Sequence, residues 1–339
     1  MDGFLEGCKI GQKRDNTFHF RNIDSVAKSM NGYEHKIKVT ENAPMIGEKG
    51  RNLTENDTKN LLNVKKVIIR DGVTGIEPNA FVHCQNIEQI ELPDSIIELP
   101  KCAFMGHMGL RRVKLSGKME KIALSAFNGC KNLEKVEIGY GTTEILDAAF
   151  SDCKNLRQIE LPETIKKIGE AAFRCSGLER IILPRSIKEI GQGAFCRCEN
   201  LKEAVLPAGI EQAGMCVFME CKQLEEVRLE PGITQIFQGM FLQCSSLKKV
   251  ELPETIEKIQ KGAFKDCVGL EEIVLPGNIS VIERGVFENC IGLKRAALPK
   301  SIQIMEVGVF KDCKNLSELE IEEGTTQIFD ATFWGCSAL

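Results

Sequence analysis

The stretch FKDCVGLEEIVLP, residues 264–276, holds the pattern that decides the fold. It begins with a Phe, followed by Cys267 three residues later and Leu270 six residues later. Ile273 and Leu275 then stand two residues apart, the period of a β-strand whose alternate side chains share one face. The closing Pro has no N–H to donate, so it marks where strand pairing stops and the chain turns.

The same pattern recurs along most of the chain. The step between successive Phe residues is 23 in ten of eleven intervals and 22 in the remaining one. The repeated aromatic residues are Phe81, Phe104, Phe127, Phe150, Phe173, Phe195, Phe218, Phe241, Phe264, Phe287, Phe310 and Phe333. The repeated thiols are Cys84, Cys130, Cys153, Cys198, Cys221, Cys244, Cys267, Cys290, Cys313 and Cys336. A repeat of 20 to 30 residues indicates a solenoid.

Two coils depart from the pattern. His107 takes the Cys position in the second coil, and we expect it on the rim of a turn. Cys175 comes only two residues after Phe173, which places the missing residue of the short interval in that turn. The 17 Phe and 15 Cys of the chain therefore report architecture first.

Each unit is expected to stack on the next, because one unit cannot bury its own apolar side. A second apolar pair, such as Ile256 and Ile259, indicates another extended piece before the Phe segment, which we expect to form about one helical turn. The predicted fold is an α/β solenoid of about twelve 23-residue coils. One parallel β-sheet lines its concave side, and the short helical turns lie on the convex side. With strands about 4.8 Å apart, the stack would be roughly 55–60 Å long.

The repeat divides the chain into two parts. Residues 58–339 form the predicted solenoid, and residues 1–57 lack the repeat and are expected to form an N-terminal cap. Within the cap we expect a short helix ending near Met30 and a strand over residues 33–40. The last residue falls in the middle of a repeat, so we expect either that the repeat array continues or that a partner covers its open end, self-association included.

The units resemble the BspA-like leucine-rich repeat family of bacteria and protists, with the consensus IxxIxxxAFxxCxxLxxIxLP. The resemblance covers about residues 58–339. It implies a curved binding solenoid, often on cell surfaces and associated with adhesion, and it brings no catalytic residues with it.

Composition excludes several functions. The formal net charge is −4, so there is no basic excess to neutralise phosphates, and we expect no nucleic-acid partner. No window of 18 apolar residues predicts a membrane span, and no signal peptide is visible. The compartment stays open: the resemblance favours the cell surface or secretion, whereas a true lack of a signal peptide favours the cytoplasm.

No metal, cofactor or catalytic site is expected. The Cys residues occur one per coil instead of in the paired clusters that zinc prefers, so we interpret them as buried thiols that pack beside Phe. The four His residues form no metal-binding motif, and no nucleophile elbow or phosphate loop occurs.

The outward position in the middle of each predicted strand is the most informative for binding. Most of these residues are charged, but two pairs on adjacent rungs are aliphatic, and they flank an Arg and a Glu. Exposed apolar pairs within a polar face can mark a contact surface, although single exposed aliphatic residues are common. The candidate binding residues are Ile182, Val205, Arg228, Glu251, Val274 and Ala297.

These observations predict a non-enzymatic protein that binds a protein or other cell-surface macromolecule on its concave face, in adhesion or host interaction. The alternative is an intracellular interaction scaffold or the sensor part of a larger protein. An enzyme would need a site built from loops, and no coil carries an insertion long enough to form one.

Overall fold

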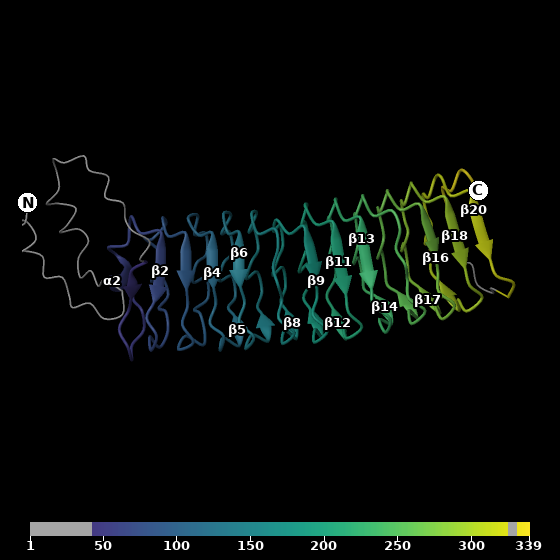
Figure 1. Cartoon of the computed structure of the whole chain (residues 1–339). Coiled ribbons are helices and arrows are strands. Elements are labelled where there is room, and N and C mark those ends of the chain that lie inside the picture. The colour runs from purple at the N-terminus through teal and green to yellow at the C-terminus, as the bar shows by residue number, and fades with distance from the viewer. Residues whose placement is uncertain (1–42, 325–330) are drawn as a thin grey trace, which may run out of the picture.

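The computed structural model describes residues 43–324 and 331–339, which form one rod of stacked coils (Figure 1). Every strand pair between neighbouring coils is parallel and in register. Val274, for example, pairs with Ala297, 23 residues further on. The predicted parallel solenoid of about twelve coils is therefore confirmed.

The strands lie in two rows, one for each extended piece of the coil, instead of the single predicted sheet. The first row is broken into three sheets. These contain β1 (Met45–Ile46), β2 (Lys66–Ile69), β3 (Gln89–Glu91), β4 (Arg112–Lys114) and β6 (Lys135–Glu137); β9 (Arg180–Ile182), β11 (Glu203–Leu206) and β13 (Glu226–Leu229); and β16 (Glu272–Val274), β18 (Arg295–Leu298) and β20 (Glu318–Ile321).

The second row consists of two-residue strands, each of which ends on the second residue of the apolar pair, as β15 ends on Ile259. Its two sheets contain β5 (Lys121–Ile122), β7 (Glu144–Ile145), β8 (Lys167–Ile168), β10 (Glu189–Ile190) and β12 (Gln212–Ala213); and β14 (Gln235–Ile236), β15 (Lys258–Ile259), β17 (Val281–Ile282) and β19 (Ile304–Met305). Inward side chains of both rows, such as Ile273 and Ile259, meet in one continuous core.

The Phe residues form a column through this core. Neighbouring ring centroids lie 5.1–5.7 Å apart along the whole column. From Phe104 onwards the rings are stacked within 17° of parallel. Eleven of these rings are almost completely buried, from Phe81 to Phe310, and Phe333 is half-buried at the end of the column.

The structure does not confirm the helical turns that were expected on the convex side. Within the described residues, the one helix is α2 (Glu55–Thr58), in the first coil. Elsewhere the Phe segment is a run of tight turns. From Phe104 onwards the residues two before and two after each Phe have positive φ, as Gly262 (59°) and Asp266 (61°) do. The Phe264 N–H donates to the Val286 carbonyl of the next coil, 2.9 Å away, so it is not available to an α-helix.

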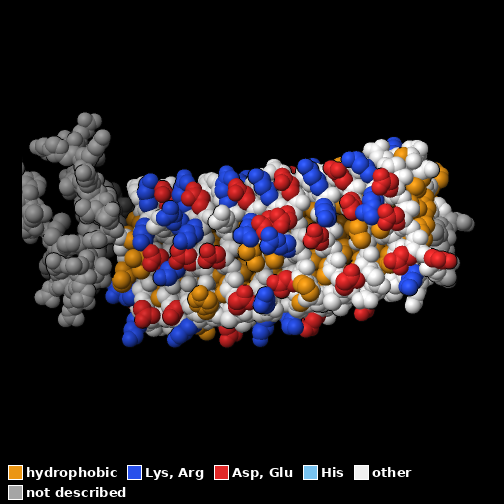
Figure 2. All heavy atoms as spheres, turned by 45° about the vertical axis from the view of Figure 1, so that its right-hand side comes forward, with side chains coloured by type: hydrophobic (Ala, Val, Ile, Leu, Met, Phe, Trp, Pro, Cys, Tyr) orange, Lys and Arg blue, Asp and Glu red, His pale blue; other side chains and the backbone are white. Residues whose placement is uncertain are grey.

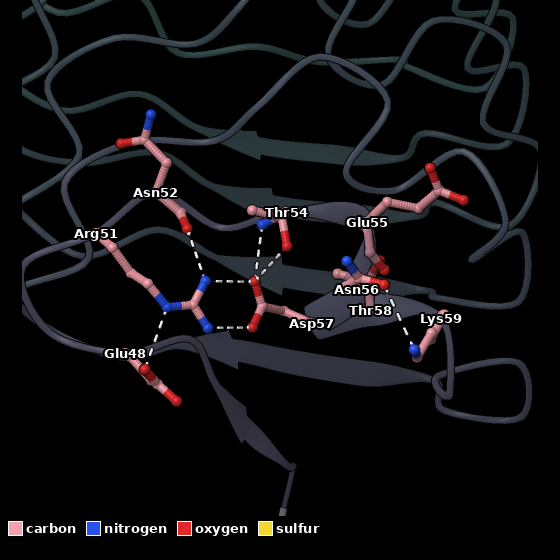
Figure 3. A network of polar contacts seen from close by, with 9 residues as sticks. All are labelled: Glu48, Arg51, Asn52, Thr54, Glu55, Asn56, Asp57, Thr58 and Lys59. Atoms are coloured by element: carbon pink, nitrogen blue, oxygen red, sulfur yellow. Dashed lines mark hydrogen bonds and ion pairs between the residues drawn. The ribbon is translucent and has the colours of Figure 1, made fainter.

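The stack reaches back to Met45, which pairs with Ile68. In this first coil Thr58 takes the Phe position and is buried, and its hydroxyl donates to the carbonyl of Ala80 in the next coil. Asp57 holds the adjoining turn, because it accepts hydrogen bonds from Arg51 and Thr54 (Figure 3). The cap helix and strand expected before residue 43 lie outside the described residues, and the division at residue 58 stays a prediction.

The position of His107 also differs from the prediction. It does not lie on the rim of its turn but in the core, with 1% of its surface exposed, and its ring meets Phe104 edge-on at 6.5 Å. The turn places this position inside the rod in every coil, so a larger polar side chain is buried with the thiols above and below it.

Candidate binding face

The six candidate binding residues lie on one surface of the rod. Val205 of β11 is the register partner of Ile182 in β9 and of Arg228 in β13. Val274 of β16 is the partner of Ala297 in β18. A bridge between Lys249 and Glu272 aligns the intervening coil, so Glu251 falls between Arg228 and Val274. We call these six residues the central patch, and the outward side of the first strand row the strand face.

The aliphatic members of the central patch are accessible. Ile182 is 49% exposed and Val274 is 48% exposed, whereas Val205 and Ala297 are partly covered. Because side chains alternate along a strand, the neighbours Ile181 and Ile273 point into the core. Ile182 and Val274 point outward and take no part in the core packing. Two small apolar areas therefore face solvent, separated by the rungs of Arg228 and Glu251.

Ion pairs neutralise most charges beside the patch. Arg180 and Glu203 pair at 2.8 Å next to Ile182 and Val205. Glu272 and Arg295 pair at 2.8 Å next to Val274 and Ala297. Charged side chains of both signs lie in rows along the rod, with apolar areas between them (Figure 2).

Each of the two central charges is paired within its own coil. Arg228 pairs with Glu226 at 3.0 Å, and Glu251 pairs with Lys249 at 3.3 Å. All four side chains are more than half exposed, so a partner can replace either interaction at little cost.

A shallow hollow of about 220 Å³ opens beside Glu251 and Val274. Pro276, Leu252 and Glu272 also line it. It is smaller than the roughly 300–1,000 Å³ of most small-molecule sites. The strand face is therefore better suited to a broad contact with a macromolecule than to enclosing a small ligand.

The chemistry of the buried thiols is that of core residues. All 14 cysteines in the described part of the chain are free. Burial raises the pKa of Cys130 and of Cys267 to about 12, so both remain protonated near neutral pH. Because the thiolate is the nucleophile and the metal ligand, these positions are poorly suited to either role. Across residues 43–324 and 331–339, no group of three or more His, Cys, Asp or Glu is placed to hold a metal ion.

One feature of this side of the rod was missed in the sequence. The residue before the first strand position alternates in charge over eleven successive coils, and its 23-residue spacing could have revealed it. The column consists of Lys65, Glu88, Arg111, Glu134, Arg157, Glu179, Lys202, Glu225, Lys248, Glu271 and Lys294. Several neighbours form ion pairs, among them Lys65 with Glu88 at 2.8 Å and Lys294 with Glu271 at 3.1 Å. We call this the alternating column.

No helix in the parts that the structure describes is long and apolar enough to cross a membrane.

Stacked parallel strands, a repeated apolar ladder and an exposed strand face define a leucine-rich repeat protein. More particularly, the chain belongs to the family described as the BspA type leucine rich repeat region, which matches residues 54–178, 120–246 and 211–339. Proteins with these repeats are typically protein-interaction modules.

One solved structure supports the fold, and two others show weaker similarity. A leucine-rich repeat protein from Bacteroides ovatus is 25% identical with a TM-score of 0.73, over 81% of this chain and 71% of that one. The leucine rich repeat protein of T. pallidum is 31% identical, over 54% of this chain and 78% of that one, with a TM-score of 0.40. The pneumococcal vaccine antigen PcpA is 18% identical, over 79% of this chain and 77% of that one, with a TM-score of 0.44. No curated protein matches the chain.

Proposed function

We propose that this chain is a non-enzymatic binding protein whose central patch contacts another protein or a cell-surface macromolecule. The observation that carries the proposal is the pair of exposed aliphatic rungs, around Ile182 and Val274, on a face whose neighbouring charges are paired within the chain. When a partner covers such a face, the neighbouring charges keep their partners, so no charge is buried unpaired, which is the costliest outcome for a buried charged group.

The role assigned to this binding is adhesion or host interaction at a cell surface. Its support is the family resemblance, in which surface binding is common. The rival role is an intracellular scaffold, or the sensor portion of a larger protein, and its support is the set of unpaired thiols, which suits a reducing compartment.

The test of the patch is a double substitution, Ile182→Lys with Val205→Glu, in the intact chain. Both side chains point to solvent, so the fold should persist, as checked by the melting curve. We expect at least a tenfold loss of binding to macromolecules captured from host and self lysates by the unaltered protein. Ile97→Lys is the matched control, because Ile97 is an exposed aliphatic residue outside the first strand row. Unchanged binding by the double variant would move the site elsewhere.

Cell fractionation separates the two roles. Recovery of the native protein with the cell envelope or the medium supports adhesion. Recovery in the cytosol alone contradicts adhesion and leaves the scaffold role, which uses the same patch.

A further inference from the structure

The order of residues across the central patch is symmetric in a particular way. Read along the rod, the rungs are Ile182, Val205, Arg228, Glu251, Val274 and Ala297. Reversing this order about the midpoint between Arg228 and Glu251 places an aliphatic residue on an aliphatic residue, and an Arg on a Glu. A surface that matches its own reversed copy is what a two-fold dimer interface requires.

We propose that the partner fitting this patch is a second copy of the same chain, packed face to face and antiparallel. The two-fold axis runs parallel to the strands, between the rungs of Arg228 and Glu251. Arg228 then faces the Glu251 of the other copy, and Val205 faces Val274. The inference rests on the proposed function, because it names an occupant for the same patch.

The flanking charges support this arrangement at the centre. The same reversal sets Glu226 of one copy against Lys249 of the other. In the alternating column it sets Lys202 against Glu271 and Glu225 against Lys248. A parallel face-to-face arrangement, with its axis along the rod through the central patch, would instead place Arg228 on Arg228 and Glu251 on Glu251, which is unfavourable.

Further out, the reversal brings like charges together: Glu203 with Glu272 one rung from the centre, and Arg180 with Arg295 two rungs from it. Each of these residues already belongs to an ion pair at 2.8 Å within its own chain, so the groups that meet are neutral as pairs. Packed sheets also diverge by about 30°, which separates positions away from the axis. The contact is therefore strongest at the central rungs.

The size of the patch sets the strength of the dimer. The rod bends only gently (Figure 1), so six rungs present a nearly flat surface about 24 Å long at about 4.8 Å per rung. Its area is on the order of 350 Å² per copy, less than half of the roughly 800 Å² of a standard interface. We expect a weak dimer whose population depends on concentration and falls with added salt.

Charge reversal and mixing test the proposal. In sedimentation velocity between about 10 µM and 1 mM, the unaltered chain should shift from monomer to dimer. Arg228→Glu alone and Glu251→Arg alone should each weaken the dimer at least tenfold, since like charges then face each other across the axis. An equimolar mixture of the two variants should dimerise again, because every central pair is then opposite in charge. If the dimer formed through another surface, Arg228 and Glu251 would not face each other, and mixing the two variants would restore nothing.

Three results would overturn the proposal. The unaltered chain could remain monomeric at 1 mM, both single variants could dimerise as well as it does, or the mixture could fail to restore the dimer. A monomeric chain that still loses its macromolecular partner on Ile182→Lys with Val205→Glu would reject the dimer but keep the proposed function. A dimer without any captured partner would do the reverse.

Discussion

The thiol of Cys267 lies 3.1 Å from the carbonyl oxygen of Phe241, one coil earlier, and donates a hydrogen bond to it. That carbonyl also accepts from the backbone N–H of Cys244 at 3.2 Å. Equivalent thiol bonds recur along the rod, as from Cys244 to Phe218 and from Cys290 to Phe264. Cys suits this position because it is a small apolar side chain with one weak donor. Ala would lack the donor, and Val would lack it and add bulk.

The first prediction concerns thiol reactivity. Cys102 is exposed, whereas Cys267 is buried and its pKa is raised to about 12 by that burial. Iodoacetamide at pH 8 should therefore alkylate Cys102 in the native protein, while Cys244 and Cys267 react only as the chain unfolds. Peptide-resolved mass spectrometry measures each site, and Cys102→Ser is the control. Alkylation of Cys267 as fast as Cys102 would contradict the buried column.

The second prediction concerns the aromatic column. Phe264 is buried between Phe241 and Phe287, with ring centroids 5.4 and 5.5 Å away. Phe264→Ala should lower the free energy of unfolding by roughly 3–5 kcal/mol, because it leaves a cavity within a stack. Phe333→Ala is the matched control: Phe333 is half-buried and has Phe310 on one side within the described residues, so a smaller loss is expected. Equal melting curves for Phe264→Ala and the unaltered protein would be incompatible with this packing.

The fold could be predicted from the sequence because each coil repeats the same physical problem. A Phe and a Cys that recur every 23 residues can all be buried only when the coils stack in register. The period alone therefore determines the parallel pairing. The turn was harder to predict. Ala263 and Phe264 suit a helix, but the positive φ of Gly262 and Asp266 is adopted so that alternate N–H groups reach the next coil. The helix and turn propensities of the individual residues do not reflect these hydrogen bonds between coils.

The central patch shows where sequence reasoning stops. The strand period correctly places Ile182 and Val274 on the surface, because their neighbours Ile181 and Ile273 must face the core. Whether a partner covers them is not encoded by the period, so their role stays a prediction. The alternating column, by contrast, was readable at 23-residue spacing. It was missed because it begins one residue before the strand, where the expected pattern of inward and outward residues gives no role to charge.

The third prediction concerns the first coil. Hydrogen bonds from Arg51 lower the pKa of Asp57 to about 2 from its usual value of 3.8, and Thr54 also donates to this carboxylate (Figure 3). A lowered pKa means that the carboxylate stabilises the fold above pH 3.8, and that this contribution is lost as the pH falls from 3.8 to about 2. Asp57→Asn should therefore weaken the first coil by about 1–2 kcal/mol at pH 6.

Hydrogen exchange of residues 45–61 measures this effect. At pH 6 the Asn variant should exchange faster in this segment alone, and Glu48→Gln should exchange almost normally, because the Glu48 side chain is 76% exposed. Uniformly faster exchange along the whole rod would show that Asp57 supports more than the first coil.

The fourth prediction concerns the one coil in which the Cys position holds a His. Both ring nitrogens of His107 are buried, and neither makes a hydrogen bond of good geometry among the described residues. His107→Cys should raise the free energy of unfolding by about 1–3 kcal/mol, because two unsatisfied polar atoms are removed and the new thiol can donate to the Phe81 carbonyl.

Burial also lowers the pKa of His107 below its usual 6.5. The unfolded chain therefore takes up a proton below pH 6.5 that the folded chain resists, so the unaltered protein loses stability as the pH falls. Urea unfolding at pH 8 and pH 5 should show the advantage of the Cys variant widening at pH 5. An advantage of the same size at both values would mean that His107 is protonated equally in the folded and unfolded chain.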